Sequence, residues 1–324
     1  MSTPNPASPA LADLVSEGPV GVAYSGGADS TALLYGAAVK WPGRIHAIHI
    51  HHGLQAAADD FVRVCTSVCQ RLDVPLHLVH VDAAHASGQS PEDAARRARY
   101  VALASVAQTW GLSIVLLGQH ADDQVETLLI ALGRGAGLPG LSAMPASFDK
   151  AGIRFCRPLL ALSSSSLRDW LLLERLEFID DPTNSDERYT RNRIRARLMP
   201  AIAEVFPHFR ATFARSASHA AQAHELLVEL AREDLARAGS PPAIKALQTL
   251  SRARQGNLLR HWLLQAHGAT PSTAQMDQLL AQIAVCTTRG HRIHLKVANG
   301  HVIRSGQTLA YIPPADTPSK LLAC

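Results

Sequence analysis

Short apolar runs alternate with helical segments through the first half of the chain, and this alternation constrains the fold more than any other feature. Each run has the length and apolar character of a buried strand. The runs are 19–24, 44–50, 75–81, 113–118 and 154–160. Helical patterns lie between them, at 31–39, 60–72, from 90 onward and at 122–132. Strands separated by helices form right-handed parallel crossovers, so we predict an α/β fold with a parallel, doubly wound sheet.

The second half of the chain has a different pattern. Residues 167–280 are mostly helical and rich in alanine. Beyond them, short alternating runs are separated by tight-turn residues such as Asn299-Gly300, which predicts antiparallel strands. We therefore expect two domains with a boundary near Pro207. Residues 1–207 form the α/β domain, and residues 208–324 form a mainly helical domain that ends in a small β-element.

The composition excludes several classes of protein. Charged residues make up 18 % of the chain and hydrophobic residues 47 %, so we expect an ordinary folded core rather than disorder. Five scattered cysteines without a Cys-x-x-Cys pair argue against a disulfide scaffold, a zinc ribbon and a cysteine-ligated cluster. The N-terminus lacks the features of a signal peptide, and the longest uncharged stretch, 100–121, contains a helix end and a turn. We predict a cytoplasmic protein.

A turn of small residues, Ser-Gly-Gly-Ala-Asp-Ser, joins the first predicted strand to the first helix. Gly26 and Gly27 allow a sharp turn and the close approach of a phosphate, which backbone N–H groups would face. Ser25 and Ser30 add hydroxyl donors, and Asp29 can hold a Mg²⁺ ion that bridges phosphates. A Gly-Gly turn can also be a plain connection. This one lies at the carboxyl edge of the predicted sheet, where open α/β sheets bind ligands.

Three carboxylates follow the fourth predicted strand within one turn of helix, at Asp122, Asp123 and Glu126. The spacing lets Glu126 share a site with either aspartate. Like charges this close raise one another's pKa and attract a cation. The alternative is an acidic helix start stabilised by solvent and the helix dipole.

Five arginines fall within ten residues of a chain whose net charge is only +4. They are Arg188, Arg191, Arg193, Arg195 and Arg197. On a helix, Arg191 and Arg195 lie on one face and the 193 and 197 positions on another. One row can then face an active site and the other RNA, since arginine forks bind phosphate and stack on bases. The alternative is a surface helix paired with Glu187 and Glu204.

The loop at 25–30 resembles the PP-loop of the N-type ATP pyrophosphatases, which cleave ATP between the α- and β-phosphates and adenylate a substrate oxygen. Three further blocks are similar to one branch of that family, the tRNA(Ile)-lysidine synthetases. The blocks are His-Ile-His-His-Gly-Leu-Gln at 49–55, Gly-Gln-His-Ala-Asp-Asp-Gln-Val-Glu-Thr at 118–127, and Asp-Pro-Thr-Asn with Tyr-Thr-Arg-Asn-Arg-Ile-Arg within 181–195. Gln55 stands where the family usually has arginine. The resemblance is looser beyond residue 200, and we expect a short form without the further C-terminal domain of longer members.

The resemblance implies four substrates and cofactors: ATP, Mg²⁺, L-lysine and a tRNA(Ile) with the anticodon CAU. The C2 oxygen of the wobble cytidine would attack the α-phosphate, and the lysine ε-amine would displace AMP to give lysidine, so that AUA is read instead of AUG. The resemblance assigns ATP binding to Ser25, Gly26, Gly27, Ala28, Asp29, Ser30, His52 and Gly53, with Asp29 also the metal ligand. It assigns catalysis to Asp29, Arg96, Arg99, Asp123, Glu126, Arg191 and Arg195. Of these, Asp123 and Glu126 would recognise lysine, and the second domain would bind tRNA.

Arg96, Arg97 and Arg99 form a second basic group on the helix that begins near residue 90. A run of this kind is usually a solvated basic face. The functional alternative is that one of them neutralises phosphate charge as pyrophosphate leaves. The residues do not distinguish Arg96 from Arg99 in this role.

Two alternative functions stay open. A tRNA thiolase would keep the PP-loop and change the nucleophile, but such enzymes typically need cysteine pairs. A non-catalytic ATP-binding module would leave the carboxylates and arginines without a purpose, and it would release no pyrophosphate. Four histidines suggest a metal site, but a full ligand set is lacking and polar roles beside ATP are favoured. They are His49, His51, His52 and His120. A homodimer is compatible with the sequence, which leaves the oligomeric state open.

Overall fold

The computed structural model describes residues 3–51, 58–81, 91–288 and 290–314. The chain divides into two compact units, 1–221 and 222–324. The division lies inside α10 (Phe209–Ala238), whose sequence contains neither glycine nor proline to interrupt a helix. The domain boundary predicted near Pro207 lies just before this helix and stays a prediction.

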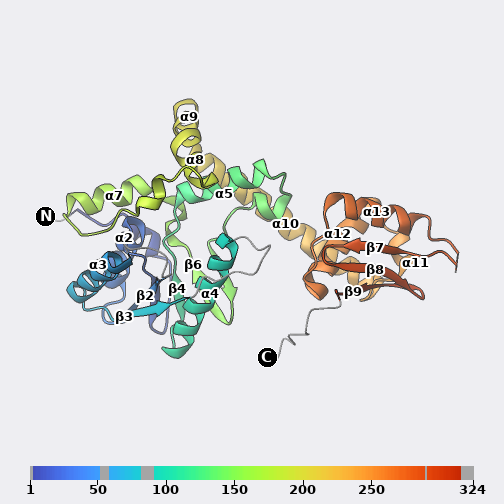
Figure 1. The fold of residues 1–324 in the computed structure, drawn as a ribbon, viewed down its shortest axis with the longest axis horizontal. Helices are drawn as coiled ribbons and strands as arrows, with labels where there is room; N and C mark the ends of the chain where they lie inside the picture. The colour runs from blue at the N-terminus through green and yellow to red at the C-terminus, as the bar shows by residue number, and fades with distance from the viewer. Residues whose placement is uncertain (1–2, 52–57, 82–90, 289, 315–324) are drawn as a thin grey trace. The chain divides into compact units, whose positions relative to one another are not determined.

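Unit 1 is built on a six-stranded sheet with the order β3-β2-β1-β4-β6-β5. Figure 1 labels β3, β2, β4 and β6 of this sheet. The strands are β1 (Val20–Ala23), β2 (Ile45–His51), β3 (Leu76–His80), β4 (Ile114–Leu116), β5 (Ser147–Lys150) and β6 (Ile153–Cys156). All neighbours pair in parallel except β5, which pairs with β6 in the antiparallel direction. The predicted parallel sheet is confirmed.

Helices cover both faces of this sheet, as a doubly wound fold requires. The helices of this region are α1 (Ala7–Leu11), α2 (Ala28–Lys40), α3 (Ala58–Arg71), α4 (Pro91–Thr109), α5 (Ala121–Gly133), α6 (Leu138–Leu141) and α7 (Ser164–Leu173), of which α1, α2, α3, α4 and α7 pack against the sheet. One buried cluster packs α2, α3 and α7 against the sheet through residues such as Leu34, Val68 and Leu167. A second cluster packs α4 against the sheet through Leu103 and Phe155.

The strand order reverses at β1. From β1 the chain runs outward through β2 and β3, and it then returns to place β4 on the other side of β1. Open α/β sheets form a crevice at the carboxyl ends of the strands where the order reverses in this way. The segment 24–30 follows β1 and the segment 117–123 follows β4, so two of the sequence motifs meet at this edge.

Two parts of unit 1 differ from the sequence-based expectation. The strand expected over 154–160 ends at Cys156, because Pro158 has no N–H to donate and begins the short 3-10 helix η1 (Pro158–Ala161). The antiparallel strand β5 and the helix α1 were not predicted, since elements of four or five residues carry little periodicity.

The arginine-rich segment forms a string of short helical elements. They are η2 (Pro182–Ser185), α8 (Thr190–Arg193), the π-helical turn η3 (Ile194–Leu198) and α9 (Met199–Val205). A small apolar cluster of Val125, Met199 and Phe209 packs this segment and the start of α10 onto α5. The arginines are thereby held beside the helix that carries the three carboxylates.

Among its described residues, unit 2 holds the end of α10, three further helices and a three-stranded antiparallel sheet, as the sequence predicts. The elements are α11 (Ile244–Gln248), α12 (Arg252–His267), α13 (Thr273–Ala284), β7 (His294–Val297), β8 (Gly300–Ser305) and β9 (Thr308–Ile312). Their core includes the buried Trp262, Leu279 and Val302. Among the described helices of the chain, none is both long and apolar enough to cross a membrane.

Candidate active site

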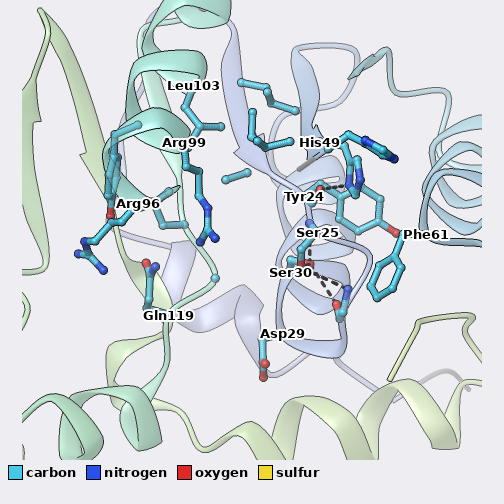
Figure 2. A pocket seen from close by; sticks show the side chains of 18 of the residues that line it. Tyr24, Ser25, Asp29, Ser30, His49, Phe61, Arg96, Arg99, Leu103 and Gln119 are labelled. Atoms are coloured by element: carbon cyan, nitrogen blue, oxygen red, sulfur yellow. Dashed lines mark hydrogen bonds between the residues drawn. The ribbon is translucent and has the colours of Figure 1, made fainter. Parts of the chain in front are cut away.

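A cavity of about 520 Å³ lies at the carboxyl edge of the sheet in unit 1. Its walls come from the segments after β1 and β4, from β2 and from α4. Apolar side chains such as Ile48, Leu103 and Leu117 line one part, and hydroxyl, carboxylate and guanidinium groups line the rest. Figure 2 shows the polar groups on two sides of the cavity, with Ser25 and Ser30 on one side and Arg96 and Arg99 on the other.

Two glycines give the first wall its shape. Gly26 has a φ of +86°, and a Cβ built there would lie 3.1 Å from the Cys65 sulfur. Gly118, after β4, packs so closely against α2 that its Cβ would lie 3.3 Å from the backbone nitrogen of Ser30. Neither position can take a side chain without moving its neighbours, and so the loop lies directly against the end of β4.

Hydrogen bonds of the two serine hydroxyls within the loop hold the conformation of residues 25–30. The Ser30 hydroxyl donates to the Gly27 carbonyl at 3.0 Å and accepts from the Ser25 N–H at 3.2 Å. The two serine hydroxyls are 3.0 Å apart. Gly27 is the N-cap of α2 and provides no side-chain cap, so the N–H groups of the first turn have no intrahelical partner and suit an anion. Of the six predicted ATP contacts in this loop, Ser25, Gly27, Asp29 and Ser30 line the cavity.

Asp29 connects the loop to the rest of the site. The Ser164 hydroxyl donates to its Oδ1 at 2.8 Å, and His120 Nε2 lies 3.5 Å from its Oδ2. Burial works to raise the pKa of Asp29, but the hydrogen bond and charge of His120, with Ser164 and Arg195, outweigh burial and hold it below its ordinary value. Asp29 therefore lines the cavity as an ionised carboxylate at neutral pH.

His120 is the N-cap of α5 and lies among carboxylates. Its Nδ1 accepts from the Asp123 N–H at 3.4 Å, while the Asp123 carboxylate accepts from the His120 N–H at 3.1 Å. Its Nε2 lies 3.3 Å from Asp123 Oδ2. Burial works to lower the pKa of His120, but Asp29, Asp123 and Asp122 outweigh burial and raise it. The sequence placed His120 beside ATP without indicating this capping role.

The three carboxylates of α5 point to three different partners. Asp122 is buried and accepts from the Ser164 N–H at 3.0 Å and from Arg210 Nε at 2.7 Å, so it ties α5 to α7 and α10. Asp123 lines the cavity. Glu126 has no exposed surface and turns toward the arginines. The fold therefore separates Asp122 from the other two carboxylates, whereas Asp123 and Glu126 both lie close to Arg195.

Glu126 gathers the first row of arginines. Arg195 Nε donates to Glu126 Oε1 at 2.8 Å, and Arg191 Nε lies 3.3 Å from Oε2. Arg195 Nη2 also lies 3.6 Å from Asp123 Oδ1, so this guanidinium joins the buried acid to the cavity wall. Burial raises the pKa of Glu126 above its ordinary value, although Arg195 and Arg191 oppose the shift. The structure thus brings together four of the predicted catalytic residues.

The second row of arginines is occupied differently. Arg193 donates to the backbone carbonyls of Glu187 and Arg188 at 3.1 Å, which holds the preceding loop onto α8. Arg197 pairs with Glu187, and Arg188 pairs with Asp186. The salt-bridged alternative therefore describes part of this cluster. Contact of this row with RNA stays a prediction.

Arg96 and Arg99 both line the cavity. Arg96 also lies over the ring of Tyr100, 5.4 Å from its centroid. Both guanidinium groups are therefore placed for the predicted phosphate role. His52 and Gly53, the remaining predicted ATP contacts, lie outside the described residues.

His49 is buried and bonded to the carbonyl of Tyr24 through Nδ1, at 2.9 Å. Burial lowers its pKa, and so a neutral ring lines the cavity. In the part of the chain that the structure describes, no group of three or more His, Cys, Asp or Glu side chains is placed to hold a metal ion. Asp29 and Asp123 line one cavity, and a pair of carboxylates with substrate phosphates is a typical Mg²⁺ environment.

Two residues of the cavity region were missed from the sequence. Gln119 lines the cavity directly after β4, and the buried Arg157 donates to its side-chain oxygen at 3.2 Å. Gln119 belongs to the block at 118–127, and its position just after the fourth predicted strand could have indicated that it lines the site. Arg157 carried no signal, because its partners are distant in sequence.

A phosphate-binding loop at the switch point of a doubly wound sheet, facing acids and arginines, defines a PP-loop ATP-utilising enzyme. Residues 7–202 match the family model described as a PP-loop domain, and residues 243–310 match the TilS substrate binding domain. The chain belongs to the tRNA(Ile)-lysidine synthase family.

Curated relatives carry that family name. One from Polaromonas naphthalenivorans is 70 % identical over 293 residues, covering 90 % of this chain and 89 % of the relative. One from Burkholderia pseudomallei is 42 % identical over 282 residues, covering 85 % of this chain and 58 % of the relative. One from Escherichia coli O157:H7 is 40 % identical over 272 residues, covering 82 % of this chain and 62 % of the relative. The chain thus spans nearly all of one relative and about three fifths of the other two.

A solved structure shares the fold. It is a U34-tRNA thiolase from Methanococcus maripaludis with a [4Fe-4S] cluster, with a TM-score of 0.56 and 15 % sequence identity, covering 66 % of this chain and 76 % of that one. At this identity the likeness concerns the fold alone. The curated relatives favour the lysidine synthase over the thiolase alternative.

Proposed function

We propose that this chain uses ATP to ligate L-lysine to C2 of the wobble cytidine of a CAU-anticodon tRNA(Ile), giving lysidine, AMP and pyrophosphate. One observation carries the proposal. A single cavity is lined by the PP-loop, by Asp123 of α5 and by Arg96 and Arg99 of α4. The Arg195 guanidinium lies beside Asp123, with Nη2 3.6 Å from Oδ1. Phosphate binding, amino-acid binding and charge neutralisation are therefore available at one place.

ATP binds with its phosphates at the N-terminus of α2 and its base in the apolar part of the cavity. The open N–H groups of the 25–30 loop face the phosphates, and Ile48 and Leu117 flank the base. Asp29, whose pKa is held low, would hold Mg²⁺ together with the phosphates, and Asp123 lines the same cavity. Mg²⁺ would withdraw charge from the phosphate oxygens.

Lysine binds through its α-amino-acid end at Asp123 and Arg195. An α-ammonium and an α-carboxylate need a carboxylate and a guanidinium side by side, and Asp123 Oδ1 and Arg195 Nη2 are 3.6 Å apart. Arg195 is partly exposed, whereas Glu126 is enclosed. We therefore assign Glu126 to positioning Arg191 and Arg195 rather than to direct contact with lysine.

The reaction then has two steps. The C2 oxygen of the cytidine attacks the α-phosphorus of ATP, and the bond to pyrophosphate breaks while Arg96 or Arg99 neutralises the leaving charge. The lysine ε-amine, once deprotonated, attacks C2, and AMP leaves with the C2 oxygen. The cytidine has to be unstacked to react, which costs little in a single-stranded anticodon.

Unit 2 and the exposed arginines after Asp181 bind the tRNA in this account. The protein works in the cytoplasm, where its tRNA substrate is found. We extend the proposal to a homodimer, which sedimentation of the purified chain tests directly.

The test is transfer of labelled lysine to tRNA. The purified full chain is incubated with ATP, Mg²⁺, labelled lysine and unmodified tRNA(Ile) bearing CAU. The control is the same tRNA with the wobble cytidine changed to uridine. We expect label in the tRNA only when both ATP and that cytidine are present. Pyrophosphate release without label would refute lysine as the nucleophile, and the absence of both would refute the enzyme.

A further inference from the structure

Arg157, directly after β6, is a buried cation without an acidic partner. Its exposed fraction is 4 %, and it forms no ion pair with any residue that the structure describes. Burying an uncompensated guanidinium destabilises a fold unless other groups satisfy it. Arg157 is satisfied by neutral groups, which are the Pro145 carbonyl at 2.7 Å, the Tyr100 hydroxyl at 3.3 Å, the Gln119 side chain at 3.2 Å and the Phe148 ring, whose centroid lies 4.4 Å from the guanidinium carbon. Its positive charge therefore remains available to its surroundings.

The contact with Arg157 fixes which way the Gln119 amide points. A guanidinium donates hydrogen bonds and accepts none. The Gln119 atom that meets Arg157 Nε must therefore be the carbonyl oxygen, which leaves the NH₂ group free to face elsewhere. Because Gln119 lines the cavity, the arrangement offers this NH₂ group to a ligand as a donor.

Arg157 also reaches the arginine wall of the cavity through Tyr100. The Tyr100 hydroxyl accepts from Arg157, and Arg96 lies over the same ring. Figure 2 shows Arg96, Arg99 and Gln119 together on the side of the cavity away from Ser25 and Ser30. Two guanidinium groups and an oriented amide donor, with a buried charge behind them, form a wall that attracts an anion.

We propose that Arg96, Arg99 and Gln119 form a second phosphate subsite across the cavity from the PP-loop, and that Arg157 positions Gln119 in it. The subsite rests on the proposed function for its ligand, which is either the pyrophosphate end of ATP or a backbone phosphate of the tRNA beside the wobble cytidine. Both sources present the same chemistry, a tetrahedral anion that needs several donors. Arg157 touches no ligand and is a positioning residue.

The first test replaces the donor by an acceptor of the same shape. Gln119→Glu keeps an oxygen for Arg157, so we expect the variant to fold, but its second oxygen repels phosphate. Binding of pyrophosphate to the full chain is measured by calorimetry, and binding of tRNA by filter retention at several salt concentrations. If ATP is the source, pyrophosphate affinity falls about tenfold. If RNA is the source, tRNA affinity falls about tenfold and its salt dependence weakens, with pyrophosphate binding unchanged.

The matched control is Gln70→Glu. Gln70 is an exposed glutamine of α3 that does not line the cavity, and the substitution adds the same charge to the same unit. It should change neither affinity. If Gln119→Glu behaves like Gln70→Glu in both assays, the subsite is overturned.

The second test separates positioning from stability. Arg157→Lys keeps the charge but loses the fork that holds Gln119. We expect it to weaken the same affinity as Gln119→Glu, and to have no further effect in a Gln119→Leu background, because the two residues act through one contact. Losses that add in the double variant would overturn the positioning role. These binding readings do not require lysine transfer, so they stay informative if the proposed function fails.

Discussion

Arg195 lies 2.8 Å from the buried Glu126 and 3.6 Å from Asp123, which lines the cavity. The Arg195 guanidinium thus contacts two acids. The enclosed Glu126 holds it in position, and Asp123, which lines the cavity, would bind lysine together with it. This relationship divides the roles of two carboxylates that stand three residues apart on one helix. It also gives different expectations for the two acids when each is neutralised.

Glu126→Gln should impair the positions of both Arg191 and Arg195. The substitution removes the charge that both guanidinium groups face. We expect kcat/KM for lysine to fall about a hundredfold, a loss of about 2.7 kcal/mol. Because burial raises the pKa of Glu126, its charged form costs stability in the fold, so the free energy of unfolding should change by less than about 1 kcal/mol even though the kinetics suffer. Steady-state kinetics and urea unfolding measure the two effects.

The control for this variant is Glu187→Gln. Glu187 also pairs with an arginine of the same segment, Arg197, but on the exposed surface. It should change the lysine kinetics by less than about twofold, as expected for a surface pair. Equal losses in the two variants would contradict the role of Glu126.

Asp123→Asn should affect lysine more than ATP. The side chain faces the cavity, and its charge matches the α-ammonium of lysine in the proposed pose. We expect KM for lysine to rise about tenfold to a hundredfold, while tRNA-dependent pyrophosphate release changes much less. Asp149→Asn, which removes the charge of an exposed strand residue paired with Arg154, serves as the control. Equal losses of pyrophosphate release and lysine transfer in Asp123→Asn would place this residue in adenylation instead.

Gly118→Ala should weaken ATP binding by disturbing the PP-loop. The new Cβ would lie 3.3 Å from the nitrogen of Ser30, so α2 or β4 must shift. We expect a loss of about 1–3 kcal/mol in unfolding free energy and about a tenfold weaker Kd for ATP. Gly133→Ala, at the end of α5 with nothing within 4 Å of its Cβ, should be neutral or stabilising by up to about 1 kcal/mol. An ATP affinity that survives Gly118→Ala would show that the loop does not depend on this close approach.

The stabilisation by His120 should depend on pH. Its pKa is raised from 6.5 in the fold, so protonated His120 stabilises the fold fully below about pH 6.5, and this contribution is lost as the pH rises through the folded value. Asp29, whose pKa is lowered from 3.8, stabilises the fold fully above about pH 3.8, and this contribution is lost as the pH falls through the lower folded value. Nδ1 accepts the capping hydrogen bond only while it carries no proton, and His120→Asn keeps such an acceptor while removing the group that titrates. The difference in Tm between wild type and variant should be larger at pH 6 than at pH 9, and a difference that is constant or grows with pH would contradict the charge network.

The alternating pattern predicted the sheet and the PP-loop position because both depend on local periodicity and turn chemistry. Segments 19–24 and 113–118 became neighbouring strands, and the motifs that follow them meet at one edge. The helical second half and its terminal antiparallel strands also followed from local signals. Short elements such as β5 did not, since four residues are too few to show a pattern.

The division of labour among the acids could not be predicted in the same way. Asp122 and Asp123 are adjacent in sequence, yet the partner that separates them, Arg210, lies 88 residues from Asp122. Spacing along a helix shows which side chains share a face, but not which distant elements pack against that face. For the same reason Arg157 could not be recognised from local patterns, since its partner Gln119 is 38 residues away.

The most direct test of the account is the mass of the wobble nucleoside after reaction. Unmodified tRNA(Ile) bearing CAU is incubated with the full chain, lysine, ATP and Mg²⁺, digested to nucleosides and analysed by mass spectrometry. We predict a nucleoside heavier than cytidine by one lysine less one water, formed only when ATP is present. An unchanged cytidine at that position, with ATP converted to AMP and pyrophosphate, would contradict the ligation of lysine to this tRNA.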